Sequence, residues 1–157
     1  MVSMARVSTV DQRRQARSIA LQCLFAIDVR GEGKEFSLDW LLEEEPLRMR
    51  PRAFAEMVLQ GVEAKRSFFD SVIQRYAPAW PVNQLPLVDR NILRIALFEL
   101  LYHDDTPPKT AVNEAVELAK LFGSGSSARF VNGVLGSVMA GLTAGDLVAE
   151  QPPPEGR

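Results

Sequence analysis

The chain has 157 residues, about the size of one ordinary domain, and its hydrophobic fraction of 46% is sufficient for a buried core. Its net charge of −2 argues against a histone-like nucleic-acid binder, whose affinity depends on bulk positive charge. The charge is uneven, because basic side chains are in excess over residues 1–30, whereas residues 39–45 carry acidic ones only. Any nucleic-acid site must therefore be a local patch.

The cysteine content and the hydropathy indicate the compartment. The chain contains one cysteine, Cys23, so it forms no intrachain disulfide, which fits a reducing environment. Residues 1–15 lack the apolar run of a signal peptide, and no stretch of 18 apolar residues occurs. We therefore expect a cytoplasmic protein that does not cross a membrane.

Three parts of different character follow one another along the chain. Residues 1–10 are rich in Ser, Val and Thr and are expected to form a flexible N-terminal arm. Residues 11–142 are expected to form a single helical domain. Residues 143–157 include three consecutive prolines and are expected to form a flexible C-terminal tail.

The first helix is predicted over residues 11–29. Its apolar positions recur at steps of three and four residues, which places them on one stripe. A short helix is predicted next, over residues 37–46, where Ser37 can cap the start and Pro46 ends it. The apolar stripe of the first helix consists of Ala16, Ile19, Ala20, Cys23 and Ile27.

The middle of the chain predicts longer helices. Residues 51–76 form either one long helix or two helices joined near residues 65–67, before a proline-rich break. Over residues 87–102, apolar side chains cover nearly every direction except that of Arg90 and Arg94. A helix of this kind belongs in the middle of a bundle.

Two last helices are predicted over residues 110–122 and 128–140. Phe122 is expected to point inward, and Gly133 and Gly136 would let a neighbouring helix approach closely. No segment shows the period-two alternation of a strand. The sequence therefore predicts an all-α fold, a six- to seven-helix bundle made of two packed helical sub-bundles.

The residues that carry most enzymatic chemistry lack the required patterns. The chain has no Cys-x-x-Cys, His-Glu-x-x-His or Gly-x-Ser-x-Gly motif. His103, beside Asp104 and Asp105, is compatible with weak metal binding, but a solvated turn is the simpler interpretation. Cys23 lies on the apolar stripe and is expected to be buried and inert. We therefore expect a protein that is not an enzyme and needs no cofactor or metal.

The first helix carries the clearest binding pattern. Arg14 and Arg17 are expected to lie away from the apolar stripe, and Arg13 near its edge, with Leu21 and Phe25 on the far side. Arginines interleaved with an exposed aromatic suit single-stranded RNA, since guanidinium groups contact phosphates and the ring stacks on a base. The alternative is that Leu21 and Phe25 pack on a second helix, with solvated arginines beyond them.

A second candidate is the glycine- and serine-rich segment 123–127. It lacks the ending of a P-loop, but it leads into the start of a helix, where free N–H groups and the positive end of the helix dipole attract a phosphate. Ser126, Ser127 and Arg129 would take part. Serine-capped helix starts are common, so an ordinary cap is the alternative.

Charged residues in the helix over 87–102 divide into two groups. Arg94 and Glu99 fall among apolar residues, so we expect them to form internal hydrogen bonds that tie the sub-bundles together. Asp89 and Arg90 are expected to be exposed and available to a partner.

Three stretches together resemble the NusB family of transcription antitermination factors. The resemblance covers residues 11–139 and is most specific in the second and third stretches. The stretches are RRQAR (13–17) followed by ALQCLF (20–25), VDRNILRIALFEL (88–100), and AVNEAVELAK (111–120) leading to RFVNGVL (129–135).

This resemblance implies a function by assembly, without catalysis or cofactor. It implies binding of single-stranded boxA-type RNA, a leader element of ribosomal RNA transcripts. It also implies binding of NusE, a small-subunit ribosomal protein, and suppression of termination on the RNA polymerase elongation complex. Since the basic patch is small, we expect weak RNA binding by the protein alone and tighter binding with NusE.

The resemblance also implies site residues. Asp89 falls where part of the NusE-facing surface is expected. The segment 124–126 departs from the family pattern, because it lacks the acidic residues of some relatives. The implied RNA-binding residues are Arg13, Arg14, Arg17, Phe25, Lys120, Ser126, Ser127, Arg129 and Phe130.

Two other functions remain as alternatives. The chain could be a stand-alone NusB-like RNA-guiding module of an RNA methyltransferase. It could also be a helical protein-interaction domain without RNA contact, in which Phe25 and the arginines face another helix or a second copy. A homodimer that hides the RNA-binding residues is open in either case.

Overall fold

The computed structural model describes residues 9–30 and 49–150, which form α-helices, one short 3-10 helix and no strand. The predicted helix over 37–46 lies outside these residues, as do 1–8 and 151–157. The all-α prediction is confirmed. The elements are α1 (Thr9–Arg30), α3 (Met49–Ala64), α4 (Arg66–Tyr76), η1 (Val82–Gln84), α5 (Leu87–Tyr102), α6 (Pro108–Phe122) and α7 (Ser127–Ala144).

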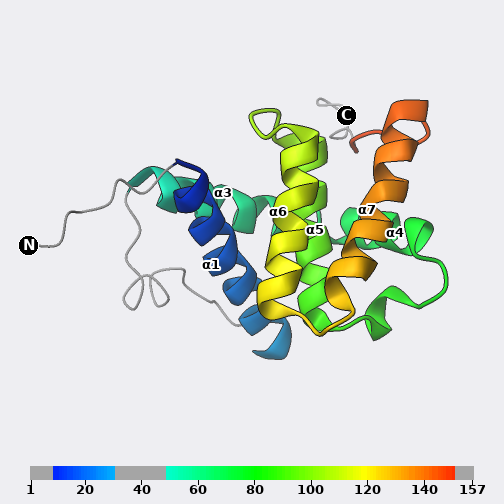
Figure 1. Cartoon of the computed structure of the whole chain (residues 1–157), viewed down its shortest axis with the longest axis horizontal. Coiled ribbons are helices and arrows are strands. Elements are labelled where there is room, and N and C mark those ends of the chain that lie inside the picture. The colour runs from blue at the N-terminus through cyan, green and yellow to red at the C-terminus, as the bar shows by residue number, and fades with distance from the viewer. Residues whose placement is uncertain (1–8, 31–48, 151–157) are drawn as a thin grey trace, which may run out of the picture.

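The helices form two groups around α5 (Figure 1). α1 packs against α3 on one side, while α4, α6 and α7 surround α5 on the other. α5 also contacts α1 and α3, and every residue from Asn91 to Glu99 is buried. The prediction of a central helix over 87–102 is confirmed, and it follows from apolar side chains that point in almost all directions.

The predicted helical stretch over 51–76 is two helices. Lys65 separates them with φ −118° and ψ 20°, which leaves the α-helical region. Its N–H donates to the carbonyls of both Gly61 and Val62 at 3.2 and 3.3 Å, so α3 closes in a tightened last turn before α4 begins.

Close helix approach occurs at glycines other than those predicted. A Cβ at Gly61 would collide with the ring of Phe98, and one at Gly141 with the hydroxyl end of Tyr76. Gly133 and Gly136 have open space instead, so their predicted role is wrong. Both lie on the solvent side of α7, whose buried side carries Val131, Val134, Leu135 and Val138.

The chain stays packed beyond the predicted end of the last helix. α7 continues to Ala144, and Gly145, with φ 79°, adopts the left-handed conformation that ends it. Leu147 is then buried, and the N–H of Glu150 donates to the hydroxyl of Tyr102 at 2.8 Å. Residues 143–150, which we expected in a flexible tail, therefore lie against α4 and α5.

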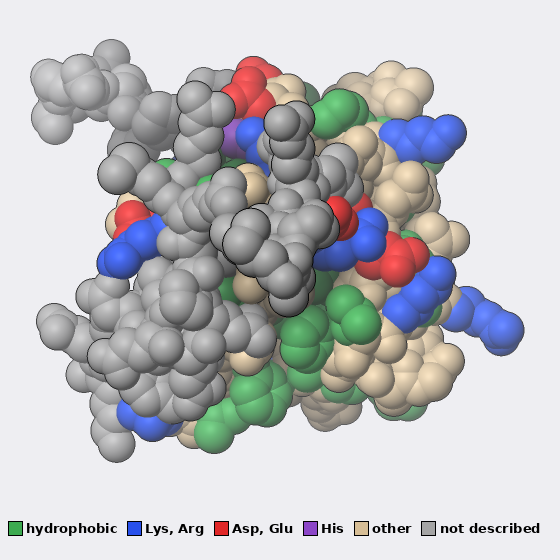
Figure 2. Space-filling model, turned by 60° about the vertical axis from the view of Figure 1, so that its left-hand side comes forward, with side chains coloured by type: hydrophobic (Ala, Val, Ile, Leu, Met, Phe, Trp, Pro, Cys, Tyr) green, Lys and Arg blue, Asp and Glu red, His purple; other side chains and the backbone are tan. Residues whose placement is uncertain are grey.

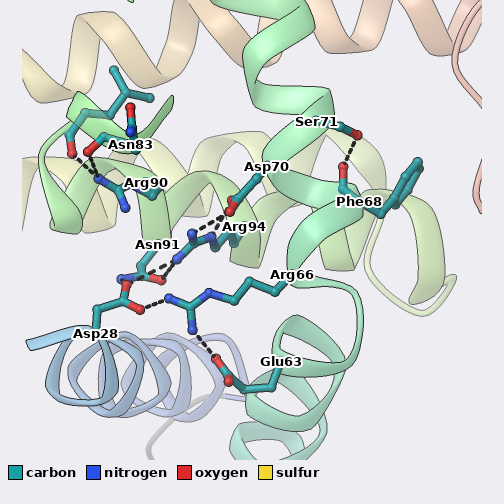
Figure 3. Close-up of polar contacts among 11 residues, drawn as sticks. Asp28, Glu63, Arg66, Phe68, Asp70, Ser71, Asn83, Arg90, Asn91 and Arg94 are labelled. Atoms are coloured by element: carbon teal, nitrogen blue, oxygen red, sulfur yellow. Dashed lines mark hydrogen bonds and ion pairs between the residues drawn. The ribbon is translucent and has the colours of Figure 1, made fainter. Parts of the chain in front are cut away.

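A buried polar network joins the two groups of helices, as predicted for Arg94 (Figure 3). Arg94 donates to both carboxylate oxygens of Asp70 at 2.7 and 2.9 Å, and to Asp28 and Asn91 at 3.2 and 2.9 Å. Arg66 forms a second ion pair with Asp28. We call these five residues the Arg94 network, which links α1, α4 and α5.

Residues at the start of α5 are more enclosed than predicted. Arg90 is half-buried because its guanidinium folds back to donate to the carbonyls of Asn83 and Leu85 at 2.9 and 2.8 Å. Asp89 is only 6% exposed. The expectation that both side chains are open to solvent is therefore wrong.

Candidate nucleic-acid interface

Most of the predicted RNA-binding residues lie along α1, α6 and the start of α7. In Figure 1, α1 and α6 run in the same direction, and α7 begins at the end of the bundle where both helices finish. Positions 14 and 25 share one side of α1, and positions 114, 117 and 120 share one side of α6. We call the exposed surface of Arg14, Phe25, Lys120, Phe122, Ser126 and Arg129 the α1–α6 face.

Arg14 forms the link between the two helices of this face. Its Nε and Nη2 donate to the two carboxylate oxygens of Glu114 on α6, each at 2.9 Å. The hydrogen bonds and the negative charge of Glu114 raise the pKa of Arg14 above its ordinary value. The Arg14 side chain stays 40% exposed, and two of its five N–H donors form hydrogen bonds to other described residues. Glu114 therefore holds a charged guanidinium in one orientation at the surface.

Arg17 differs, and its predicted exposure is wrong. It is 2% exposed and donates to both carboxylate oxygens of Glu99 on α5 at 2.9 and 2.7 Å. Thr106 donates a further hydrogen bond to Glu99 at 3.0 Å. The side of α1 that we expected to face solvent packs against α5. Arg17 therefore forms a buried ion pair that connects the two helices. The prediction of internal bonds for Glu99 is confirmed.

Arg13 lies half-buried at the edge of the bundle. Its guanidinium carbon is 5.0 Å from the ring centroid of Phe54 on α3, and that of Arg17 is 5.1 Å from the same ring. No ion pair of Arg13 is found within residues 9–30 and 49–150. The guanidinium of Arg13 is therefore positioned by a cation–π contact, and no described carboxylate neutralises its positive charge.

Phe25 is 40% exposed, whereas Leu21 on the preceding turn is buried. The two alternatives for this side of α1 thus each describe one residue: Leu21 packs on other helices and Phe25 stays open. Figure 2 shows apolar side chains gathered on the lower part of the molecule in that view, beside basic ones.

The end of α6 adds an aromatic that the sequence placed in the core. Phe122 is 39% exposed, so the expectation that it points inward is wrong. It occupies the last turn of α6, where the chain leaves the packed helix. Lys120, two residues earlier, is exposed and pairs with Glu117 at 3.2 Å.

The segment 123–127, which we call the serine loop, is ordered by its own side chains. The Ser127 hydroxyl accepts a hydrogen bond from the N–H of Ser124 at 2.9 Å, and the Ser124 hydroxyl lies within 3.3 Å of that of Ser126. Ser126 is the N-cap residue but makes no capping side-chain bond. Its hydroxyl is exposed at the positive end of α7, beside exposed Arg129.

The remaining predicted residues are less accessible. Ser127 is 1% exposed and is occupied in bracing the serine loop. Phe130 is half-buried and packs against the core. Asp89, predicted to face a protein partner, is buried, but its Oδ1 has no hydrogen-bond partner in the part of the chain described.

Arg14, Phe25, Lys120, Ser126 and Arg129 are thus accessible on α1, the end of α6 and the start of α7, while Arg17 and Ser127 are buried. Sequence reasoning missed three residues of the site. Phe122 and Phe54 were both assigned to buried helix faces, which is right for Phe54, and Glu114 was not considered. The position of Glu114, 100 residues from Arg14, left no local signal.

The single histidine and the single cysteine are both enclosed. His103 is 8% exposed, so the predicted solvated turn is wrong: the ring is stacked on Phe98 and lies near Phe54. Cys23 is buried as predicted, and burial raises the pKa of its thiol to about 11. Over residues 9–30 and 49–150, no cluster of His, Cys, Asp and Glu is arranged to hold a metal, and no helix has the length and hydropathy to cross a membrane.

The sequence comparisons identify relatives over most of the chain. A model of the NusB family matches residues 14–140. The transcription antitermination protein NusB of Chloroflexus aggregans is 47% identical over 138 residues, which cover 87% of this chain and 92% of that protein. The protein of the same name from Dehalococcoides mccartyi is 47% identical over 130 residues, covering 83% and 91%.

Solved structures give the same result. The structure of T. maritima NusB superposes with a TM-score of 0.72 at 34% identity, covering 82% of this chain and 90% of that one. A chain from a complex of the antitermination factors NusB and NusE with double-stranded RNA superposes with a TM-score of 0.74 at 25% identity, covering 82% and 96%.

Proposed function

The chain belongs to the NusB family, and we propose that it is an RNA-binding transcription antitermination factor that acts by assembly rather than catalysis. Its RNA ligand would be single-stranded boxA-type leader RNA of ribosomal transcripts, and its protein partner would be NusE. The pair would join the RNA polymerase elongation complex in the cytoplasm. The family match over residues 14–140 carries this proposal.

We propose that RNA lies along the α1–α6 face. Arg14 suits a phosphate, because Glu114 fixes the guanidinium while three of its five N–H donors have no partner among the residues that the structure describes. Lys120 and Arg129 add positive charge, and Ser126 adds an exposed hydroxyl at the start of α7. Phe25 and Phe122 offer ring faces to unpaired bases.

The charge of this surface is small, which favours a shared complex. Arg14, Arg17 and Lys120 are balanced by Glu114, Glu99 and Glu117, so Arg13 and Arg129 supply most of the excess charge. Few phosphate contacts mean weak binding that falls with salt. A partner such as NusE that binds RNA and protein together would raise the affinity. For the NusE contact we retain Asp89 on the family resemblance, although its side chain is buried at the start of α5.

The test is a fluorescence anisotropy titration of a labelled boxA-type RNA at several salt concentrations, with and without NusE. The wild-type protein alone should bind with a dissociation constant of about micromolar or weaker, and NusE should tighten it. Arg14→Glu should weaken RNA binding on the order of tenfold or more, measured below a melting temperature that the new carboxylate beside Glu114 lowers. Arg75→Glu on α4 is the control, since it makes the same charge change on another exposed arginine.

Phe25→Ala separates RNA contact from protein contact. If Phe25 stacks on a base, the variant weakens RNA binding even without NusE. If only the NusE-dependent part of the affinity is lost, Phe25 contacts the protein partner instead. Equal RNA affinity of wild type and Arg14→Glu would contradict the proposal and favour a protein-interaction domain.

The methyltransferase-module alternative is less supported. The two relatives described above carry the antitermination name and are matched over more than nine-tenths of their own length. A guiding module would be expected to bind folded or substrate RNA without gaining affinity from NusE. The NusE arm of the titration therefore distinguishes the two functions.

A further inference from the structure

A pocket of about 330 Å³ opens at the end of the bundle where α1 and α3 begin and α5 meets α6. This volume lies within the range of small-ligand sites. Six of its lining residues come from three separate parts of the chain. They are Gln12 and Arg13 of α1, Phe54 and Met57 of α3, and His103 and Asp105 of the α5–α6 turn.

We propose that this pocket, the Arg13–His103 pocket, receives one unpaired base of the bound RNA. This inference rests on the proposed function and adds a base-recognition site to the phosphate-binding face. The pocket continues directly from that face, because Arg13 lines it and its neighbour Arg14 stands on the surface.

The walls suit a flat heterocycle. The guanidinium of Arg13 lies over the ring of Phe54 at 5.0 Å, so a planar cation is held in place at one wall. Guanidinium planes and aromatic rings are the surfaces on which unpaired RNA bases stack. Met57, an apolar and polarizable side chain, is 40% exposed at the same pocket.

The hydrogen-bonding groups suit the edge of a base. His103 is 8% exposed, and its Nε2 is buried without a hydrogen-bond partner in the described chain. Such an orphan is uncommon in folded proteins and needs an explanation. A base edge, which carries donors and acceptors side by side, can supply the missing bond. Gln12 adds an amide, and Asp105 adds an exposed carboxylate.

The same groups argue against a free phosphate as the ligand. The carboxylate of Asp105 lines the pocket opposite any anion that Arg13 would attract. A carboxylate instead accepts from an exocyclic amino group, as acidic side chains do from cytosine. Adenine, cytosine and guanine carry that group, so each of them can pair with Asp105.

The test replaces one base at a time in the boxA-type RNA by the fluorescent base 2-aminopurine. Wild-type protein should change the fluorescence strongly at one position, where the base leaves solvent and stacks. Arg13→Lys keeps the charge but removes the plane, and should abolish this signal and weaken binding about five- to tenfold. Arg75→Lys on α4 is the matched control, since it makes the same exchange at an exposed arginine outside the proposed site, and it should preserve both signal and affinity.

Two further variants guard against a folding artefact. Met57→Ala changes a surface side chain and should weaken binding about two- to fivefold. His103→Phe keeps the ring contacts with Phe54 and Phe98 but removes the ring nitrogens. It should reduce the 2-aminopurine fluorescence change at the reporting position and leave the other positions unchanged. Melting temperatures confirm that each variant is folded.

The outcomes separate this inference from the proposed function. RNA binding that needs Arg14 but is unaffected by Arg13→Lys, Met57→Ala and His103→Phe, with no reporting position, overturns the pocket and leaves the function standing. A loss of NusE affinity alone in these variants also overturns it. Absence of RNA binding by wild type, with or without NusE, overturns both.

Discussion

Two arginines, Arg94 and Arg14, tie α1 to its neighbours. They differ in how many of their N–H donors form hydrogen bonds. Arg94 makes four hydrogen bonds to three residues and is 2% exposed. Arg14 makes two hydrogen bonds to one residue, and its side chain is 40% exposed. A buried guanidinium with four of its five donors bonded can only hold the fold, whereas an exposed one with two of five bonded in the described chain is still able to bind.

The electrostatic surroundings differ in the same way. In the Arg94 network, burial and the positive charge of Arg94 lower the pKa of Arg66. At the α1–α6 face, Glu114 raises the pKa of Arg14. Both arginines stay charged at physiological pH, so the contrast concerns the stability of each arrangement rather than protonation. The buried network carries the higher cost if one member is removed.

The largest expected effect is that of Arg94→Ala. It leaves the carboxylate of Asp70 without its bidentate partner and takes one of two arginine partners from Asp28, and removing one member of a buried ion pair typically costs about 3–5 kcal/mol. Urea denaturation should show this loss in the free energy of unfolding. Arg75→Ala, on the surface of α4, should change it by less than about 0.5 kcal/mol. A loss below about 1 kcal/mol for Arg94→Ala would break the comparison.

Arg17→Ala sharpens the comparison, because Arg17 belongs to the same sequence motif as Arg14 but is buried. Glu99 would keep only the hydrogen bond from Thr106, so the free energy of unfolding should fall by about 3 kcal/mol. RNA affinity, measured by anisotropy below the melting transition, should stay within about twofold of wild type. An unchanged free energy of unfolding together with a large loss of RNA affinity would show instead that Arg17, like Arg14, binds RNA.

Two glycines extend the comparison from side chains to backbone. Gly61→Ala places a methyl group against the buried ring of Phe98 and should destabilise the protein by about 1–3 kcal/mol. Gly133→Ala enters open space on α7 and should stabilise it by about 0.5–1 kcal/mol through helix propensity. Thermal denaturation should show a lower melting temperature for Gly61→Ala and a higher one for Gly133→Ala. Equal changes in the two variants would contradict the packing at these glycines.

The smallest expected loss of stability is that of Arg14→Ala. Glu114 is buried but Arg14 is 40% exposed, and Glu114 keeps Arg17 at 3.8 Å, so the free energy of unfolding should fall by only about 1 kcal/mol. Its effect should be on RNA binding, where the slope of log affinity against log salt becomes shallower by about 0.7. A loss of stability as large as that of Arg17→Ala would show that Arg14 has the same structural role as Arg17.

Sequence periodicity predicted α5 to the residue, because an almost uniformly apolar helix has one place in a bundle. It was less successful on α1. A single stripe assigns one buried side, but α1 packs against both α3 and α5, so Leu21 and Arg17 are buried outside the stripe. The charge of Arg17 gave no sign of this, since its partner Glu99 lies on another helix.

Positions at the ends of helices were the least predictable. Phe122 follows the apolar period of α6 but lies beyond the last neighbour that could cover it, so it is exposed. Asp89 and His103, at the start and just after the end of α5, are polar residues that nearby segments enclose. Local pattern cannot show which part of the chain folds over a helix end.

The length of α6 sets a geometric requirement on any bound nucleic acid. Its 15 residues extend about 22 Å, with the Arg13–His103 pocket beside the turn that precedes it and the serine loop directly after it. An oligonucleotide too short to cover that span can occupy one end or the other, but not both. In a series of increasing fragment lengths, affinity should therefore rise in one step, at the footprint where a single strand first reaches both ends.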